Sequence, residues 1–112
     1  MEEEMLRKIN EYIESGNEYF KEGNYRMAFR SYLEAMYSIS VYLIYRDLGM
    51  LLPPGGALGM IKIRYPDIYE VMEKYIPHET RITSVDEALV KSIREDLTKY
   101  LKEIVASKGD CP

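Results

Sequence analysis

The feature that most constrains this chain is a long segment, residues 25–48, whose apolar side chains cover nearly the whole circumference of a helix. One stripe recurs at spacings of three and four residues, which indicates a helix; it consists of Ala28, Phe29, Tyr32, Ala35, Met36, Ile39 and Leu43. Five more side chains widen it: Leu33, Tyr37, Val41, Tyr42 and Ile44. A helix that is apolar nearly all round is contacted on several sides. We therefore expect residues 25–48 to form the central helix of an all-helical fold.

Three further segments show helical periodicity. We expect a helix over residues 2–21, which begin with three glutamates, because negative charge is favourable at a helix N-terminus. Gly23, just beyond this segment, is its expected left-handed cap. A short helix is expected after Pro66, because proline suits the first helical position. The last helix is expected to begin at Thr83 or Ser84, since both fit the spacing of a capping box, and to end at residues 108–109.

Residues 49–65, which read GMLLPPGGALGMIKIRY, interrupt this pattern. The run Pro53–Gly56 predicts irregular structure, and only residues 60–65 carry a weak strand signal. Long loops inside a compact domain are usually functional or disordered, and the apolar side chains here argue against disorder. The expected fold is all-α: a four-helix antiparallel bundle with an N-terminal helical hairpin and a Gly/Pro-rich apolar loop. We expect one domain over residues 1–107 and a tail over residues 108–112.

The composition is that of a globular protein, with 46% hydrophobic and 30% charged residues. No apolar run reaches the ~20 residues of a membrane-spanning helix, and the acidic start is not the basic leader of a signal peptide. We therefore expect a cytoplasmic protein. The chain lacks glutamine and is rich in Glu, Lys, Ile and Tyr, a bias typical of proteins from thermophiles.

The residues offer little for catalysis or cofactor binding. The single cysteine, Cys111, has no disulfide partner, and one histidine, His78, is too few to complete a zinc site with it. The glycines at 55, 56 and 59 lack the Gly-Lys-Ser/Thr ending of a phosphate-binding loop. We interpret Glu34 as one half of a surface ion pair with Arg30, four residues earlier. We interpret His78 as an exposed turn residue; the alternative is that His78 acts as a general base beside Arg81. We expect no cofactor, no metal and no enzymatic activity.

The first hairpin resembles a tetratricopeptide repeat. The matching residues are Tyr12, Gly16, Tyr19, Gly23, Tyr25, Ala28, Tyr32 and Ala35. In such a hairpin Gly16 and Ala28 would allow the two helices to approach closely. The closing proline of the repeat is replaced by Ser40, and no second copy follows, although an isolated repeat buries too little to stand alone. The hairpin is thus expected inside another fold.

The chain as a whole resembles the HEPN class of small prokaryotic helical domains over roughly residues 11–105. The resemblance is carried by Gly23-x-Tyr25-x-x-Ala28-x-x-Ser31-Tyr32-x-x-Ala35-Met36, the long apolar second helix and the Gly/Pro-containing segment after it. It implies an RNA- or nucleotide-binding protein with a nucleotidyltransferase as a candidate partner. Many active HEPN ribonucleases carry Arg and, after four to six residues, His; this chain lacks that pair, so no catalytic residue is carried over.

Two surfaces are candidates for function. The apolar side chains of the 49–65 segment exceed what one small domain needs, and large exposed apolar patches usually mark interaction sites. We therefore expect a homodimer whose interface includes Leu51, Leu52, Leu58, Met60 and Ile61.

The second candidate surface is basic. If the 49–65 segment folds over the second helix, one basic face would form from Arg26, Arg30, Arg46, Lys62 and Arg64, interleaved with tyrosines as in single-strand binders. The net charge of −4 favours the first reading, a non-catalytic self-associating module, over HEPN-type nucleic-acid binding.

Overall fold

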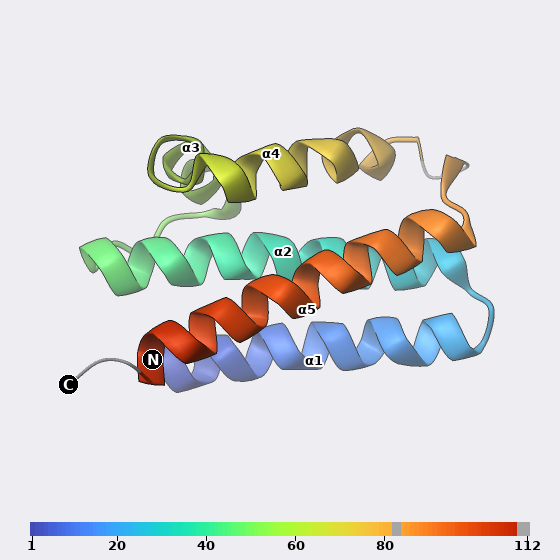
Figure 1. Cartoon of the computed structure of the whole chain (residues 1–112), viewed down its shortest axis with the longest axis horizontal. Coiled ribbons are helices and arrows are strands. Elements are labelled where there is room, and N and C mark those ends of the chain that lie inside the picture. The colour runs from blue at the N-terminus through green and yellow to red at the C-terminus, as the bar shows by residue number, and fades with distance from the viewer. Residues whose placement is uncertain (82–83, 110–112) are drawn as a thin grey trace.

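The computed structural model describes residues 1–81 and 84–109, and every regular element in this part of the chain is helical. The elements are α1 (Glu2–Lys21), α2 (Tyr25–Leu48), α3 (Pro54–Arg64), α4 (Pro66–Tyr75), the short 3-10 helix η1 (Ile76–Glu79) and α5 (Glu87–Gly109). Figure 1 shows the antiparallel α1–α2 hairpin with α5 crossing it. Helices α3 and α4 lie above α2 in this view, on the side away from α1. The expected all-helical fold is confirmed. Among the described helices, none combines the length and the apolar character needed to cross a membrane.

Helix α2 lies at the centre of the molecule, as its sequence predicts, and contacts α1, α3 and α5. Its inward side chains are at most 3% exposed; they include Phe29, Tyr32, Met36, Ile39, Tyr42, Leu43 and Ile44. The other helices each contribute buried apolar residues to the same core: Ile9 from α1, Ile61 from α3, Met72 from α4, and Ile93 and Leu97 from α5. The apolar side chains around α2 are thus buried by contacts on several sides.

The ends of α2 follow local sequence signals. Gly23 and Gly49 adopt left-handed backbone conformations, with φ of 75° and 68°, which glycine accepts without steric cost. The side chain of Asn24 accepts a hydrogen bond of 3.3 Å from the backbone N–H of Met27 and so caps the helix N-terminus. The predicted limits of α1 and α2 are confirmed.

Close packing of α1 on α2 depends on Gly16. A Cβ added at this position would lie 2.5 Å from a ring carbon of Tyr32, and the Tyr32 side chain is fully buried. The Tyr32 hydroxyl donates a hydrogen bond to the Asn17 side chain, which fixes the ring against α1. We expected Ala28 to face Gly16; the atoms nearest to the open side of Gly16 instead belong to Tyr32, one helical turn further along α2.

The expectation of an irregular loop over residues 49–65 is wrong, because residues 54–64 form α3, and no strand occurs at residues 60–64. The number of α-helices in the described chain is therefore five, not four. Pro54 occupies the first turn of α3, where proline lacks only an N–H that would have no helical partner. Ala57 and Ile61, four residues apart, are fully buried, so one face of α3 packs into the core while its backbone is hydrogen-bonded within the helix.

The last helix begins later than the capping-box spacing predicts. Asp86 accepts a hydrogen bond of 2.9 Å from the backbone N–H of Leu89, and α5 starts at Glu87. Thr83 lies outside the described residues, as do 110–112 of the expected tail. Helix α5 runs to Gly109, as expected, and so includes the first two residues of the predicted tail.

Candidate interaction surface

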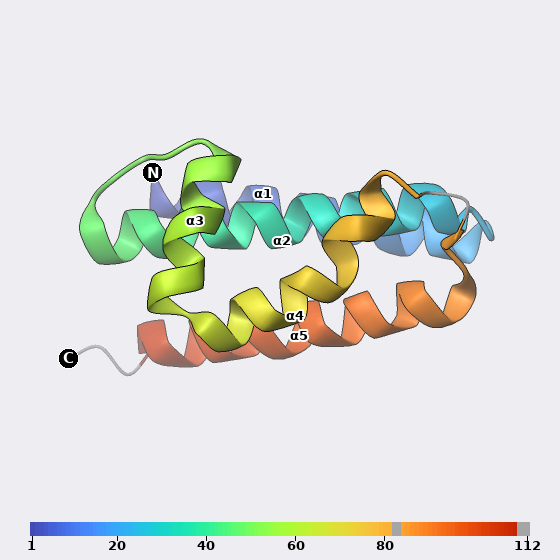
Figure 2. The same ribbon diagram turned by 90° about the horizontal axis from the view of Figure 1, so that it is seen from above.

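Exposed apolar side chains gather at the end of the molecule where α2 leads into α3. Among the described residues, the large hydrophobic side chains that are at least 36% exposed are Met1, Met27, Leu48, Met50, Leu51 and Ile63. Four of these six lie between residues 48 and 63, at the end shown on the left of Figures 1 and 2. We call Leu48, Met50, Leu51 and Ile63, together with the outward glycines Gly55 and Gly59, the α3 patch.

The α3 patch overlaps the predicted interface only in part. Leu51 is 59% exposed, as a contact residue should be, whereas Ile61 is 0% exposed and belongs to the core of its own chain. Leu52, Leu58 and Met60 are half-buried and pack against that core. The helix explains this difference, because it turns Ile61 inward while leaving other side chains at the surface.

Sequence reasoning missed the most exposed member of the patch, Ile63, which is 76% exposed. It lies four and eight residues after Gly59 and Gly55, a spacing that places all three on one side of a helix. That spacing would have identified Ile63 if residues 54–64 had been recognised as helical. Figure 2 shows α3 lying across α2 on the outside of the molecule, with no other helix over its outer side.

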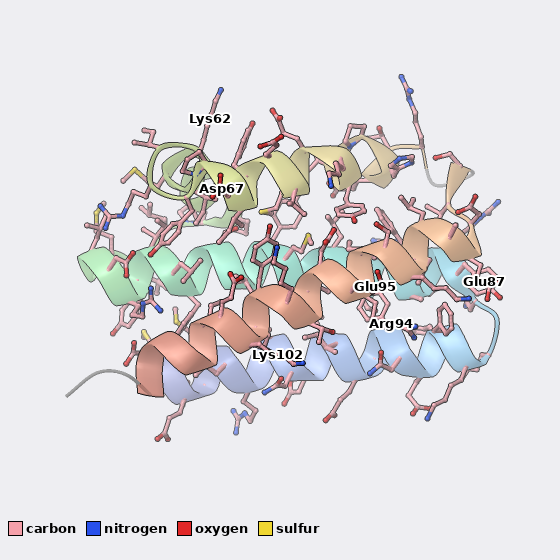
Figure 3. All side chains as sticks on the ribbon, in the orientation of Figure 1. Lys62, Asp67, Glu87, Arg94, Glu95 and Lys102 are labelled. Atoms are coloured by element: carbon pink, nitrogen blue, oxygen red, sulfur yellow. The ribbon has the colours of Figure 1, made fainter. Side chains whose placement is uncertain are left out.

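The predicted basic face does not form as one surface. Arg26 and Arg30 lie near the start of α2, whereas Arg46 lies near its end, sixteen residues or about 24 Å from Arg30 at the α-helical rise. Lys62 extends outward from α3 (Figure 3), with its Nζ 5.6 Å from the centre of the Tyr69 ring. The structure thus brings Arg46 and Arg64 together and leaves Arg26 and Arg30 apart from them.

Arg46 and Arg64 meet at a carboxylate that the sequence analysis did not single out. The Nε of Arg46 lies 3.1 Å from Asp47 Oδ1, and a terminal nitrogen of Arg64 lies 3.5 Å from Asp47 Oδ2. Tyr65 donates a hydrogen bond to Asp47 and accepts one of 3.2 Å from Arg46. This cluster ties the end of α2 to the end of α3, so both arginines serve a contact within the chain.

The protonation of this cluster follows from its surroundings. Burial by itself would raise the pKa of Asp47, but hydrogen bonds from Tyr65 and Arg46 and the two arginine charges outweigh it, so the pKa is lowered. Burial raises the pKa of Tyr65, and the adjacent Asp47 carboxylate adds to that effect. Asp47 is therefore an anion and Tyr65 a neutral donor at neutral pH, which is the pairing that their hydrogen bond requires.

The His78 side chain is held in a turn. Its Nδ1 lies 2.7 Å from Ser84 Oγ, and its ring meets the Phe29 ring edge-on with centres 6.2 Å apart. Ser84 Oγ donates to the Arg81 carbonyl oxygen at 2.7 Å, so it accepts its bond from the Nδ1–H of His78. His78 is half-buried instead of exposed, and its contacts connect η1 to the segment before α5. This arrangement is that of a structural histidine.

A shallow groove of about 320 Å³ lies between α1 and α2, near the start of α3. Its lining is mostly apolar and consists of Met5, Lys8, Tyr12, Glu34, Tyr37, Ser38, Val41 and Pro54. Tyr37 donates a hydrogen bond of 3.1 Å to Glu79, and burial, followed by the neighbouring Glu79 carboxylate, raises the pKa of Tyr37 to about 12. Tyr37 is thus a neutral hydrogen-bond donor at neutral pH.

In the described part of the chain, no three His, Cys, Asp or Glu side chains converge as metal ligands.

Comparison with protein-family models, with curated proteins and with solved structures gives no significant match.

Proposed function

We propose that this protein is a non-catalytic helical module that self-associates as a homodimer through the α3 patch. The observation that carries the proposal is the concentration of exposed large hydrophobic side chains at residues 48–63, led by Ile63 and Leu51 at 76% and 59% exposure. Single exposed apolar residues are ordinary, but a gathered set usually marks an interaction site. A two-fold partner is the commonest way for a soluble chain to cover such a surface.

The test is the mass of the wild type and of two charge variants by light scattering at high micromolar concentration. We expect a dimer for the wild type and a monomer for Ile63→Asp, because a carboxylate would be buried without a partner in the contact. Met27→Asp is the matched control, since Met27 is also exposed, at 36%, but lies at the start of α2. A monomeric wild type, or an Ile63→Asp variant that stays dimeric, would contradict the proposal.

The finer architecture belongs to the same proposal. We propose that α1, α2, α4 and α5 form an antiparallel four-helix bundle, with α3 added to one end. The chain direction reverses from each of these four helices to the next in Figure 1, which supports this reading. The Tyr75 hydroxyl in α4 donates a hydrogen bond to Asp96 and accepts one of 2.6 Å from Ser92, both in α5, and so joins two neighbouring helices of this bundle.

A second candidate function is a cytoplasmic, HEPN-type RNA- or nucleotide-binding protein, with a nucleotidyltransferase as its candidate partner. Lys62 favours it, because this exposed cation on α3 has its Nζ 5.6 Å from the centre of the Tyr69 ring, and charge beside an aromatic ring is the pairing that single-strand binders use. The test is fluorescence anisotropy with labelled single-stranded RNA at low salt. Binding that weakens with Lys62→Glu but not with Arg26→Glu supports this function, and no binding by the wild type excludes it for RNA.

A further inference from the structure

Two glycines of α3 have no steric reason for their presence within a single copy of the chain. A Cβ added at Gly55 or at Gly59 would meet no atom within 4 Å, in contrast to Gly16, where it would collide with Tyr32. Glycine in a helix interior is less favourable than alanine, because it gives up more conformational freedom on folding. Gly59 lies in the interior of the eleven-residue α3 and carries this cost, and Gly55 lies outward in its first turn. Glycine at such positions is useful where another backbone approaches closely.

The outer stripe of α3 is complementary to itself in size. It reads Gly55, Gly59, Ile63, at a spacing of four residues, so a small position and a large one lie at equal distances from Gly59. When this stripe meets an antiparallel copy of itself at Gly59, the exposed Ile63 of each helix lies over the open Gly55 of the other. A parallel arrangement would place Ile63 against Ile63 and leave both glycines facing empty space.

We infer that a second copy of this chain packs on α3, with the two α3 helices antiparallel and crossing at Gly59 on a two-fold axis. The inference rests on the proposed self-association and specifies its contact. Ridges formed by residues four apart pack at about −50° when both helices use them, and the glycines allow the close approach that this requires.

The charges on α3 favour the same orientation. The helix has no acidic residue, and its two basic residues, Lys62 and Arg64, lie in its last turn. A parallel pair would bring the basic ends of both helices side by side, where like charges repel. The antiparallel pair separates them to opposite ends of the contact, and it also sets the helix dipoles in opposition.

Disulfide trapping tests this geometry in the full chain carrying Cys111→Ser, so that each introduced cysteine is the single one. Cysteine at Gly59 needs no repacking, because nothing lies within 4 Å of its Cβ. We expect Gly59→Cys to form a disulfide-linked dimer under mild oxidation, since a disulfide requires Cα atoms within about 7 Å. Gly55→Cys should not link to itself, because two such residues would lie about 12 Å apart along the helix axes.

A mixture of Gly55→Cys and Ile63→Cys proteins completes the design, and it should yield the mixed disulfide in preference to either homodimer. Met27→Cys measures the background of random collisions from an exposed site at the start of α2. A wild type that is dimeric by light scattering, yet whose Gly59→Cys variant links no faster than Met27→Cys, would overturn the α3 crossing and leave self-association standing. Rapid linking of Gly55→Cys to itself would overturn the antiparallel orientation. A monomeric wild type would overturn both proposals.

Discussion

Replacing Gly16 by alanine tests the closest contact between α1 and α2. The new methyl group would lie 2.5, 2.7 and 2.9 Å from three carbons of the Tyr32 ring. The ring cannot move aside easily, because Tyr32 is fully buried and its hydroxyl is bonded to Asn17. Separations below about 3 Å are strongly repulsive, so the ring or the helix must shift. Overpacking of this kind typically costs ~1–3 kcal/mol.

A second effect of Gly16→Ala acts in the opposite direction. Alanine is a better helix former than glycine by about 0.8–1.0 kcal/mol in a helix interior, and Gly16 lies well inside α1. The expected net loss in the free energy of unfolding is therefore about 1 kcal/mol. For a domain of this size, such a loss lowers the melting temperature by roughly 4 °C or somewhat more.

Gly56→Ala is the matched control, because it makes the same change in a helix where space is free. Its added Cβ would lie 3.7 Å from Leu52 Cβ, an ordinary van der Waals contact. We expect this variant to be at least as stable as the wild type, because alanine is the better helix former and the added methyl group displaces nothing. Urea unfolding followed by circular dichroism, with all proteins at one concentration, measures both changes. A Gly16→Ala protein as stable as the wild type or more stable would refute the tight contact with Tyr32.

The remaining predictions concern the core, two buried hydroxyls and catalysis. Ala28→Leu should lower the free energy of unfolding by ~1–3 kcal/mol, because Ala28 is fully buried; an unchanged melting temperature would contradict this. Tyr75→Phe should lower the free energy of unfolding by ~1–3 kcal/mol, since it removes the hydroxyl that donates to Asp96. Tyr42→Phe should leave stability unchanged or raise it, because the buried Tyr42 hydroxyl has no hydrogen-bond partner among the described residues. Burial, followed by the bond to Asp96, raises the pKa of Tyr75 from 10.0 to about 12; the folded state therefore retains the proton that the unfolded state loses, and stability should fall as the pH rises from about 10 to 12, less steeply in Tyr75→Phe. We also expect no ribonuclease activity, and RNA cleavage that disappears with His78→Ala would contradict this.

The sequence determined the helices whose limits are set by neighbouring residues. Gly23, Asn24 and Gly49 fix the ends of α1 and α2 through backbone conformation and capping, which act within a few residues. Pro66 likewise marks the start of α4. The central place of α2 also followed from its sequence, because a helix that is apolar nearly all round requires neighbours on several sides.

Tertiary structure decided α3 and the surface that it presents. Its three glycines disfavour a helix locally, but Ala57 and Ile61 are fully buried in the core, and that burial stabilises it. The same long-range contact determined which residues of the predicted sites are exposed and which are paired. It buried Ile61, exposed Ile63, and brought Arg64 and Tyr65 to Asp47, none of which the local sequence specifies. Arg26 and Arg30 stayed at the other end of α2, because one rigid helix holds them about 24 Å or more from Arg46.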